Sequence, residues 1–199
     1  MPHRLYTFAF LSSAILFMGC ASTTMRSVHR EPGFRSGDIH HVLIIGVFQN
    51  QGNRKAFEDE FVRQWSRRGV QAASSLEVLP PSTSLDKNGV APIAKAKGFD
   101  TVLVTRLLER KKIEPGQLAV PDISVPQPND LQNSNNVWQT LLAPPVSTEA
   151  HDLVTLETNL YDVAAEKRIW SGWSETAVMS KVPKLIPPFV RLILKRLYD

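Results

Sequence analysis

The chain has 199 residues, a formal net charge of +4, and 43% hydrophobic and 21% charged residues. These proportions are typical of a globular protein and exclude a disordered or fibrous chain, and the length without a leader of about 20 residues is that of one domain. A pI near 9.3 is too mildly basic to indicate a nucleic-acid partner, and we expect none.

The first 19 residues have the pattern of a signal peptide. A single charge at Arg4 precedes an apolar run from Leu5 to Met18, and Gly19 is a small residue directly before Cys20, the sole cysteine of the chain. The arrangement resembles a bacterial lipoprotein signal, in which the cysteine is lipidated and becomes the mature N-terminus. The run is shorter than the roughly 20 apolar residues of a transmembrane helix, which disfavours an uncleaved anchor.

An ordinary secretory signal cleaved after Cys20 or Ala21 remains the alternative, because Phe17 stands where the lipoprotein pattern usually has leucine. A structural role for Cys20 is poorly supported. It has no second cysteine for a disulfide, and a zinc site needs several clustered ligands. We therefore predict lipidation, including palmitate, at Cys20.

Residues 20–38 are predicted to form a flexible tether. They contain small, polar, proline and glycine residues without apolar periodicity. Three arginines, Arg26, Arg30 and Arg35, lie in this range and could either contact anionic lipid headgroups or remain solvated.

The region from residue 39 to residue 108 reads as alternating strands and helices. The expected elements are a buried strand at 41–48, an amphipathic helix at 54–68 capped by Asn53 and stopped by Gly69, a weaker strand at 70–78, a short helix at 88–97 and a strand at 101–108. This order implies parallel strands joined by right-handed crossovers.

Residues 111–150 are predicted to be a proline-rich insertion, because a loop of this length without periodicity is unusual in a compact domain. Its strong apolar side chains are Trp138, Leu141 and Leu142. Two interpretations stay open: these side chains pack back onto the domain, or they form an exposed contact for a partner.

Alternating residues at 152–162 and 168–178 predict a long antiparallel hairpin, and residues 188–198 predict a terminal helix with Pro188 in its first turn. The expected fold is α/β, a mixed sheet in two or three layers. It is formed by β-α-β-α-β followed by the hairpin and the helix. Residues 39–199 would form this single domain.

No motif for catalysis, phosphate binding or zinc binding is present in the sequence. The adjacent His40 and His41 would point to opposite faces of a strand and could not share a metal. Arg106 could hold an anion in a pocket near Asn50, where strand C-terminal ends meet loops. The alternative interpretation is that Arg106 is a surface residue at the end of a strand, without a ligand. We expect no cofactor, no metal and no enzymatic activity.

The segments Val42–Val47, Phe57–Val62, Asp100–Leu107, Leu156–Val163 and Ile169–Thr176 together resemble small envelope lipoproteins of Gram-negative bacteria. The fold of that group is similar to the α/β domains of the curli secretion lipoprotein and of the lipoprotein activators of penicillin-binding proteins. The resemblance implies action through protein contacts rather than catalysis, and it carries over no functional residue. By analogy, Ser22 rather than aspartate soon after Cys20 implies the periplasmic face of the outer membrane.

Two classes of function follow. The leading hypothesis is a lipid-anchored periplasmic protein that binds another envelope protein as a non-catalytic assembly factor. The alternative is an envelope ligand-binding protein or enzyme with a pocket at the strand C-terminal ends. Homo-oligomerisation through the hairpin edge or the terminal helix is a further hypothesis, since strand edges readily pair with other chains.

Overall fold

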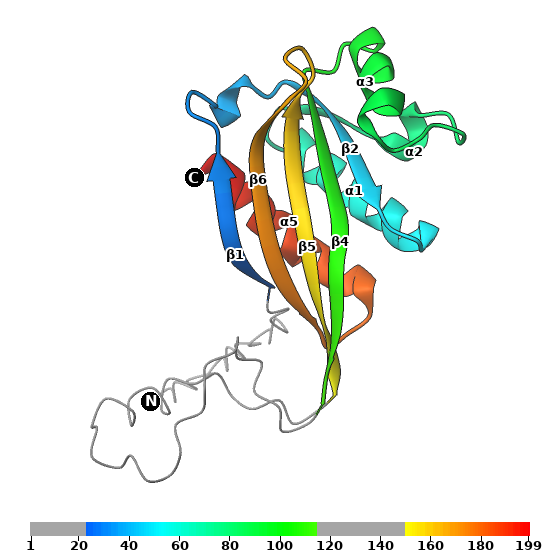
Figure 1. Ribbon diagram of the computed structural model, residues 1–199, viewed down its shortest axis with the longest axis vertical. Coiled ribbons are helices and arrows are strands. Elements are labelled where there is room, and N and C mark those ends of the chain that lie inside the picture. The colour runs from blue at the N-terminus through cyan, green and yellow to red at the C-terminus, as the bar shows by residue number, and fades with distance from the viewer. Residues whose placement is uncertain (1–22, 115–149) are drawn as a thin grey trace, which may run out of the picture.

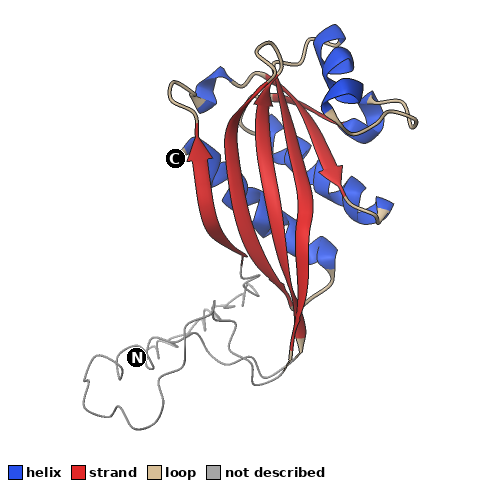
Figure 2. Ribbon diagram, in the orientation of Figure 1, coloured by secondary structure: helices blue, strands red, loops and turns tan. Residues whose placement is uncertain are grey.

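The computed structural model describes residues 23–114 and 150–199. They form one six-stranded sheet in the order β1-β6-β5-β4-β2-β3, with helices on both of its faces (Figures 1 and 2). The strands are β1 (Thr23–Arg30), β2 (His41–Val47), β3 (Gln71–Ser74), β4 (Thr101–Ile113), β5 (His151–Asp162) and β6 (Lys167–Val178). The helices are α1 (Gln51–Ser66), α2 (Ser75–Val78), α3 (Lys87–Ala96) and α5 (Val182–Tyr198), with a short 3-10 turn at Ser36–Asp38.

The sheet is mixed, which confirms the predicted α/β class. β2 pairs in parallel with both β3 and β4, as the strand–helix–strand order requires. The remaining neighbours, β4 with β5, β5 with β6 and β6 with β1, are antiparallel. The long hairpin of β5 and β6 therefore extends the parallel half of the sheet, and it is confirmed.

Helices α1 and α5 cover one face and form the main core. The aromatic stripe of α1, Phe57, Phe61 and Trp65, is buried against α5, where Phe189 and Ile193 are also buried. The i, i+4 spacing of the stripe places the three rings on one side of α1, which is why this side faces the sheet. This packing confirms the amphipathic helix that the sequence predicts.

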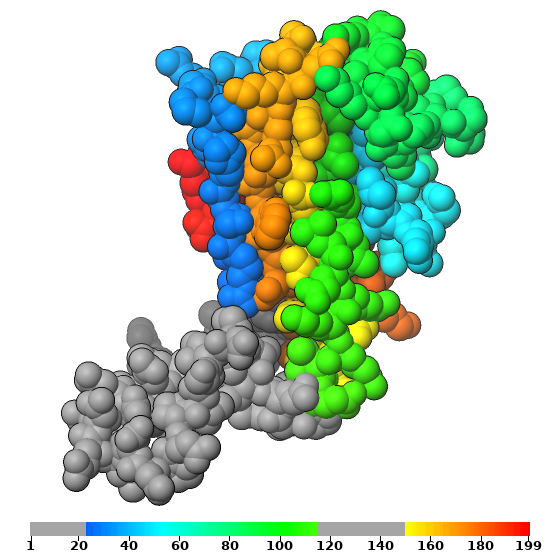
Figure 3. All heavy atoms as spheres, in the orientation of Figure 1, coloured from blue at the N-terminus to red at the C-terminus, as the bar shows by residue number. Residues whose placement is uncertain are grey.

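Helix α3 covers only part of the opposite face. A second core lies there between α3 and the first strands, with Leu43 and Ile45 of β2 against Val90 and Ala94 of α3. No described helix lies over β1, β6, β5 and most of β4 on this face, which Figure 3 shows as open. The molecule is therefore three-layered at one side and two-layered elsewhere.

The prediction of a flexible tether over 20–38 is wrong for residues 23–30. They form β1, which pairs with β6 from Thr23 opposite Thr176 to Arg30 opposite Trp170. Two of the tether arginines have partners inside the fold. Arg26 forms an ion pair with Glu175, and the Arg30 guanidinium donates to the Leu197 carbonyl at 2.9 Å, at the C-terminal end of α5.

Several predicted boundaries also shift. β3 covers only Gln71–Ser74 of the strand expected at 70–78, because the chain turns into α2 at Ser75, where the Ser74 side chain accepts from the Leu76 N–H. β4 continues to Ile113, so residues 111–113 belong to a strand and not to the predicted insertion. α5 begins at Val182, and Pro188 lies in its interior because burial of Leu185, Ile186 and Phe189 offsets the hydrogen bonds that prolines cannot make.

Candidate functional site

The C-terminal end of β2 separates two hollows. One, which we name the sheet-face cleft, contains Arg106 and lies on the face covered by α3. The other, which we name the α5 pocket, contains Asn50 and lies against α5. Val47, the last residue of β2, lines both. The sequence predicts one pocket near Asn50 and Arg106, but the structure places these residues in two.

The sheet-face cleft has a volume of about 430 Å³ and an apolar floor with a charged rim. The floor and walls are formed by side chains of β2, β4 and α3, namely Ile45, Val47, Val90, Ala91, Val102 and Val104. The rim includes Glu166, whose carboxylate pairs with Lys87 at 2.7 Å and with Lys95 at 2.5 Å. Hydrogen bonds from Lys87 and Lys95 lower the pKa of Glu166 to about 2.

Beside the cleft, a row of side chains crosses the open sheet face. The register places Val47, Arg106, Glu157, Trp173 and Ser27 opposite one another on five neighbouring strands, and directly opposite residues share a face. The Arg106 Nε donates to Glu157 Oε2 at 2.6 Å, and the Trp173 indole N–H donates to Glu157 Oε1 at 3.3 Å. The row thus holds a half-exposed indole, 48% accessible, in a fixed position.

Glu157 is the centre of this row and is only 5% exposed. Burial raises the pKa of its carboxyl, but hydrogen bonds from Arg106, Asn159 and Trp173 and the charge of Arg106 outweigh it, so the pKa lies below its ordinary value. The carboxylate is therefore ionised in the folded protein and acts as an acceptor that orients Arg106 and Trp173.

The effect of Glu157 on stability should depend on pH. Because its pKa is depressed in the folded state, its contribution is present above the ordinary value of 4.5 and is lost as the pH falls through the folded-state pKa. Glu157→Gln should lower the free energy of unfolding at pH 7. As the pH falls below 4.5, the free energy of unfolding should decrease less in this variant than in the native protein. Urea melts between pH 7 and pH 3 measure both effects, and an unchanged pH profile in the variant would contradict the assignment.

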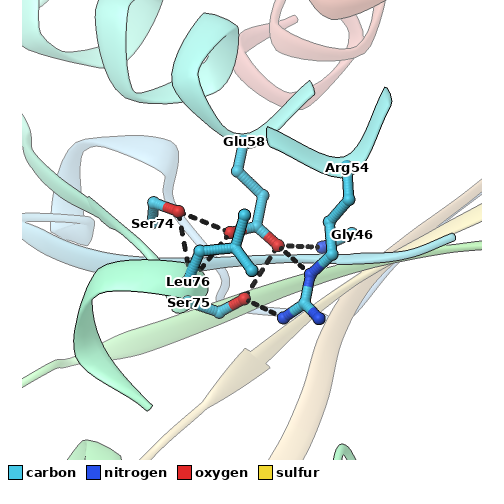
Figure 4. A network of polar contacts seen from close by, with 6 residues as sticks. All are labelled: Gly46, Arg54, Glu58, Ser74, Ser75 and Leu76. Carbon is cyan, nitrogen blue, oxygen red and sulfur yellow. Dashed lines mark hydrogen bonds and ion pairs between the residues drawn. The ribbon is translucent and has the colours of Figure 1, made fainter. Parts of the chain in front are cut away.

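A second buried carboxylate, Glu58, joins α1 to the sheet. It is 0% exposed and accepts five hydrogen bonds, as Figure 4 shows. Arg54, one turn earlier in α1, contacts it at 2.9 Å and also donates to the Ser75 hydroxyl at 2.7 Å. The donors to Glu58 are Gly46 N–H, Arg54 Nε, Ser74 Oγ, Ser75 Oγ and Leu76 N–H. All of these donors are satisfied inside the fold, so the network is structural.

The α5 pocket has a volume of about 670 Å³. It lies between the starts of α1 and α5, the second half of β4 and the first half of β5. Its apolar lining is formed by Val47, Phe48, Phe57, Leu107, Val154, Leu156, Val178, Val182, Leu185, Ile186 and Phe189. Asn50 is also part of the lining, and its side chain caps α1 by accepting from the Asn53 N–H at 2.9 Å. The helix therefore begins three residues earlier than the sequence predicts.

Among the predicted site residues, only Arg106 lies within the part of the chain that the structure describes. It closes no strand end, since β4 continues beyond it, and it is held by Glu157. Cys20, Trp138, Leu141 and Leu142 lie outside the described residues. Sequence reasoning assigned no role to Glu58, Glu157 or Trp173. The one available signal was the alternation of the hairpin, which places Glu157 and Trp173 on its polar face.

No three His, Cys, Asp or Glu side chains come together as a metal site within residues 23–114 and 150–199. Only His41 belongs to β2, and His40 directly precedes the strand. The His41 ring stacks on Phe99 at 4.1 Å between centroids and contacts the Gly98 carbonyl at 2.9 Å. None of the helices in the described part is long and apolar enough to cross a membrane.

No protein-family model and no curated protein sequence matches the chain. Among solved structures, the chain is similar to PelC from Paraburkholderia phytofirmans, crystallised as a dodecamer, at 13% identity and a TM-score of 0.49 over 89% of this chain and 99% of PelC. It is also similar to the lipoprotein GNA1162 from Neisseria meningitidis, at 12% identity and a TM-score of 0.45 over 79% of this chain and 97% of that one. At these scores neither likeness assigns a function or a state of assembly.

Proposed function

We propose that this chain is a lipid-anchored envelope protein that presents the open face of its sheet to another envelope protein and acts without catalysis. The observation that supports this is the position of β1. Thr23, the first residue of β1, follows Cys20 by three positions and already pairs with Thr176. A lipid on Cys20 would therefore hold the folded sheet within about 10 Å of the membrane, because three extended residues span no more.

The open face is suited to a protein partner. It carries Trp173 in a defined orientation, and tryptophan and arginine are the side chains that most often dominate the binding energy of interfaces. Arg106 lies next to it with a half-exposed side chain. Because Glu157 already fixes both groups, little conformational entropy is lost when a partner covers them.

The anchor is tested by Cys20→Ser. The variant should move from the membrane fraction to the soluble periplasmic fraction, since a protein without a lipid has no described element that spans the bilayer. Immunoblots of fractionated cells measure the shift. Full membrane retention of Cys20→Ser would contradict lipidation at this residue.

The partner surface is tested separately with a photo-crosslinking side chain at position 173 in the full chain on membranes. A control at Asp59, which is exposed on α1 and therefore lies on the other face, keeps the chain otherwise unchanged. We expect a discrete crosslinked protein from position 173, absent at position 59 and diminished by Arg106→Ala. Equal labelling at both positions, or none at 173, would contradict the proposal.

The α5 pocket favours the second candidate function, an envelope ligand-binding protein. Its volume of about 670 Å³ falls within the range of small-molecule sites, which is roughly 300–1,000 Å³. The two functions are compatible, because the pocket and the open face lie on opposite sides of the sheet.

A further inference from the structure

The chemistry of the α5 pocket favours a hydrocarbon ligand. Eleven of its sixteen lining residues are aliphatic or aromatic, so a ligand would contact mainly carbon. Three of the polar lining residues already have partners. Asn50 caps α1, Arg110 contacts Asp152 at 2.9 Å, and the Thr176 hydroxyl contacts the Thr23 hydroxyl at 2.9 Å. Because these groups are satisfied, the pocket offers shape and apolar surface more than directional hydrogen bonds.

The pocket lies at the end of the sheet where the chain enters the fold. Thr176 belongs to its lining and contacts Thr23, the first residue of β1. Cys20 precedes Thr23 by three positions, so a fully extended chain between their two Cα atoms spans at most about 11 Å. A membrane that holds Cys20 is therefore next to this end of the sheet.

Exposed apolar side chains line the pocket or directly follow its lining residues in the sequence. Val47 and Leu107 line it and are 39% and 46% exposed, and Leu108 and Met179, which follow the lining residues Leu107 and Val178, are 40% and 67% exposed. Lys181 and Lys184 are exposed at the start of α5, next to Met179. Apolar side chains flanked by lysines are typical of surfaces that contact the interface of an anionic bilayer.

We propose that the α5 pocket binds one acyl chain of a membrane lipid and leaves the head group outside. The occupant is an acyl chain because the lining is hydrocarbon, the polar lining groups named above are satisfied, and the pocket is adjacent to the membrane-attached end of the sheet. The inference rests on the proposed anchor for access to lipid, but the pocket itself does not depend on it.

The experiment uses the chain from residue 20 onward with Cys20→Ser, which carries no lipid of its own. Isothermal titration with octanoate, decanoate and dodecanoate, each below its micelle concentration, measures binding. Each added methylene should tighten binding about fourfold while it is buried, so each step of two carbons should give roughly tenfold or more. Absence of binding, or affinities that do not change with chain length, would overturn the proposal in favour of a pocket filled by another segment or a second copy.

Two neighbouring leucines provide a matched pair of variants. Leu107→Trp places a larger side chain in the pocket and should lower dodecanoate affinity at least tenfold, whereas Leu108→Trp, at a neighbouring position outside the lining, should leave it within twofold. Thermal melts of both variants establish that each is folded. Equal affinities in the two variants would overturn the site.

A preparation of the native, lipidated protein distinguishes the two possible sources of the bound acyl chain, a membrane lipid and the lipid on Cys20. Binding of dodecanoate to both the native protein and Cys20→Ser supports a membrane lipid as the occupant. Binding to Cys20→Ser alone would overturn that source and assign the pocket to the acyl chain on Cys20. Retention of Cys20→Ser on membranes together with dodecanoate binding would overturn the anchor but not the pocket.

Discussion

Replacing Glu58 by alanine should lower the free energy of unfolding by about 3–5 kcal/mol, because removing one partner of a buried ion pair leaves the other uncompensated. Arg54 has only 13% of its side chain exposed and would lose its carboxylate. The Gly46 N–H and the Ser74 and Ser75 hydroxyls would lose their acceptor in the same buried space. Each such unsatisfied donor adds to the loss.

Chemical denaturation of Glu58→Ala and of Asp59→Ala measures this prediction with a matched control. Asp59 is the next residue of the same helix, and its carboxylate contacts Lys55 at the surface, where an ion pair contributes little. Asp59→Ala should therefore leave the unfolding midpoint nearly unchanged. Similar midpoints for the two variants would show that the network does not hold α1 to the sheet.

The Glu58 network also positions the candidate sites. Its bond to Gly46 fixes the residue directly before Val47, and Val47 separates the sheet-face cleft from the α5 pocket. Its bonds to Ser74, Ser75 and Leu76 fix the corner between β3 and α2. A single carboxylate thus connects α1, β2 and the edge strand β3.

The sequence predicts the core elements because their signals are local. The run at 41–48 is apolar on both faces, and the stripe of Phe57, Phe61 and Trp65 has helical spacing, so β2 and α1 follow from neighbouring residues alone. Gly69 and Gly98 lie just after the ends of α1 and α3, and their positive φ angles of 79° and 74° are typical of residues that end a helix. These features depend on spacing within one element, which a sequence displays directly.

The candidate site depends on contacts between distant residues, which a sequence does not display. Arg106 and Glu157 meet only because β4 and β5 pair in one particular register across the proline-rich insertion. Glu58 looks like any polar residue on the outer side of an amphipathic helix until β3 and α2 bring Ser74 and Ser75 to it. Each of the two pockets is likewise lined by residues from four or more helices, strands or loops that are distant in the sequence.

β1 is the largest difference between expectation and structure, and its cause is its position. Thr23–Arg30 is an edge strand with polar side chains, and its partner strand lies about 150 residues away in the sequence. Its apolar members, Met25 and Val28, are too few for a periodic signal. The strand is therefore specified by the free edge of β6 rather than by its own pattern.

Replacing residues 23–30 by eight residues of glycine and serine should lower the free energy of unfolding by roughly 4 kcal/mol or more. The exchange keeps the length of the chain but removes the packing of Met25 against the core and the contact of Arg30 with the end of α5. It also weakens a ladder of backbone hydrogen bonds, each of which contributes about 0.5–1.5 kcal/mol net. A tether would tolerate this change, whereas a strand of the sheet would not.

The control is the same exchange over residues 32 and 33, between β1 and the 3-10 turn, where Gly33 already has a φ of 89°, no element is interrupted and the ion pair of Glu31 with Lys167 is kept. Urea melts of the two variants should differ clearly, with only the β1 exchange destabilised. If both exchanges were neutral, β1 would not belong to the stable fold, and the proposed lipid on Cys20 would not fix the sheet at the membrane. The test therefore links the stability of an edge strand to the proposed function: an acyl chain at Cys20 can hold the α5 pocket and the open face in place only if β1 transmits that position to the sheet.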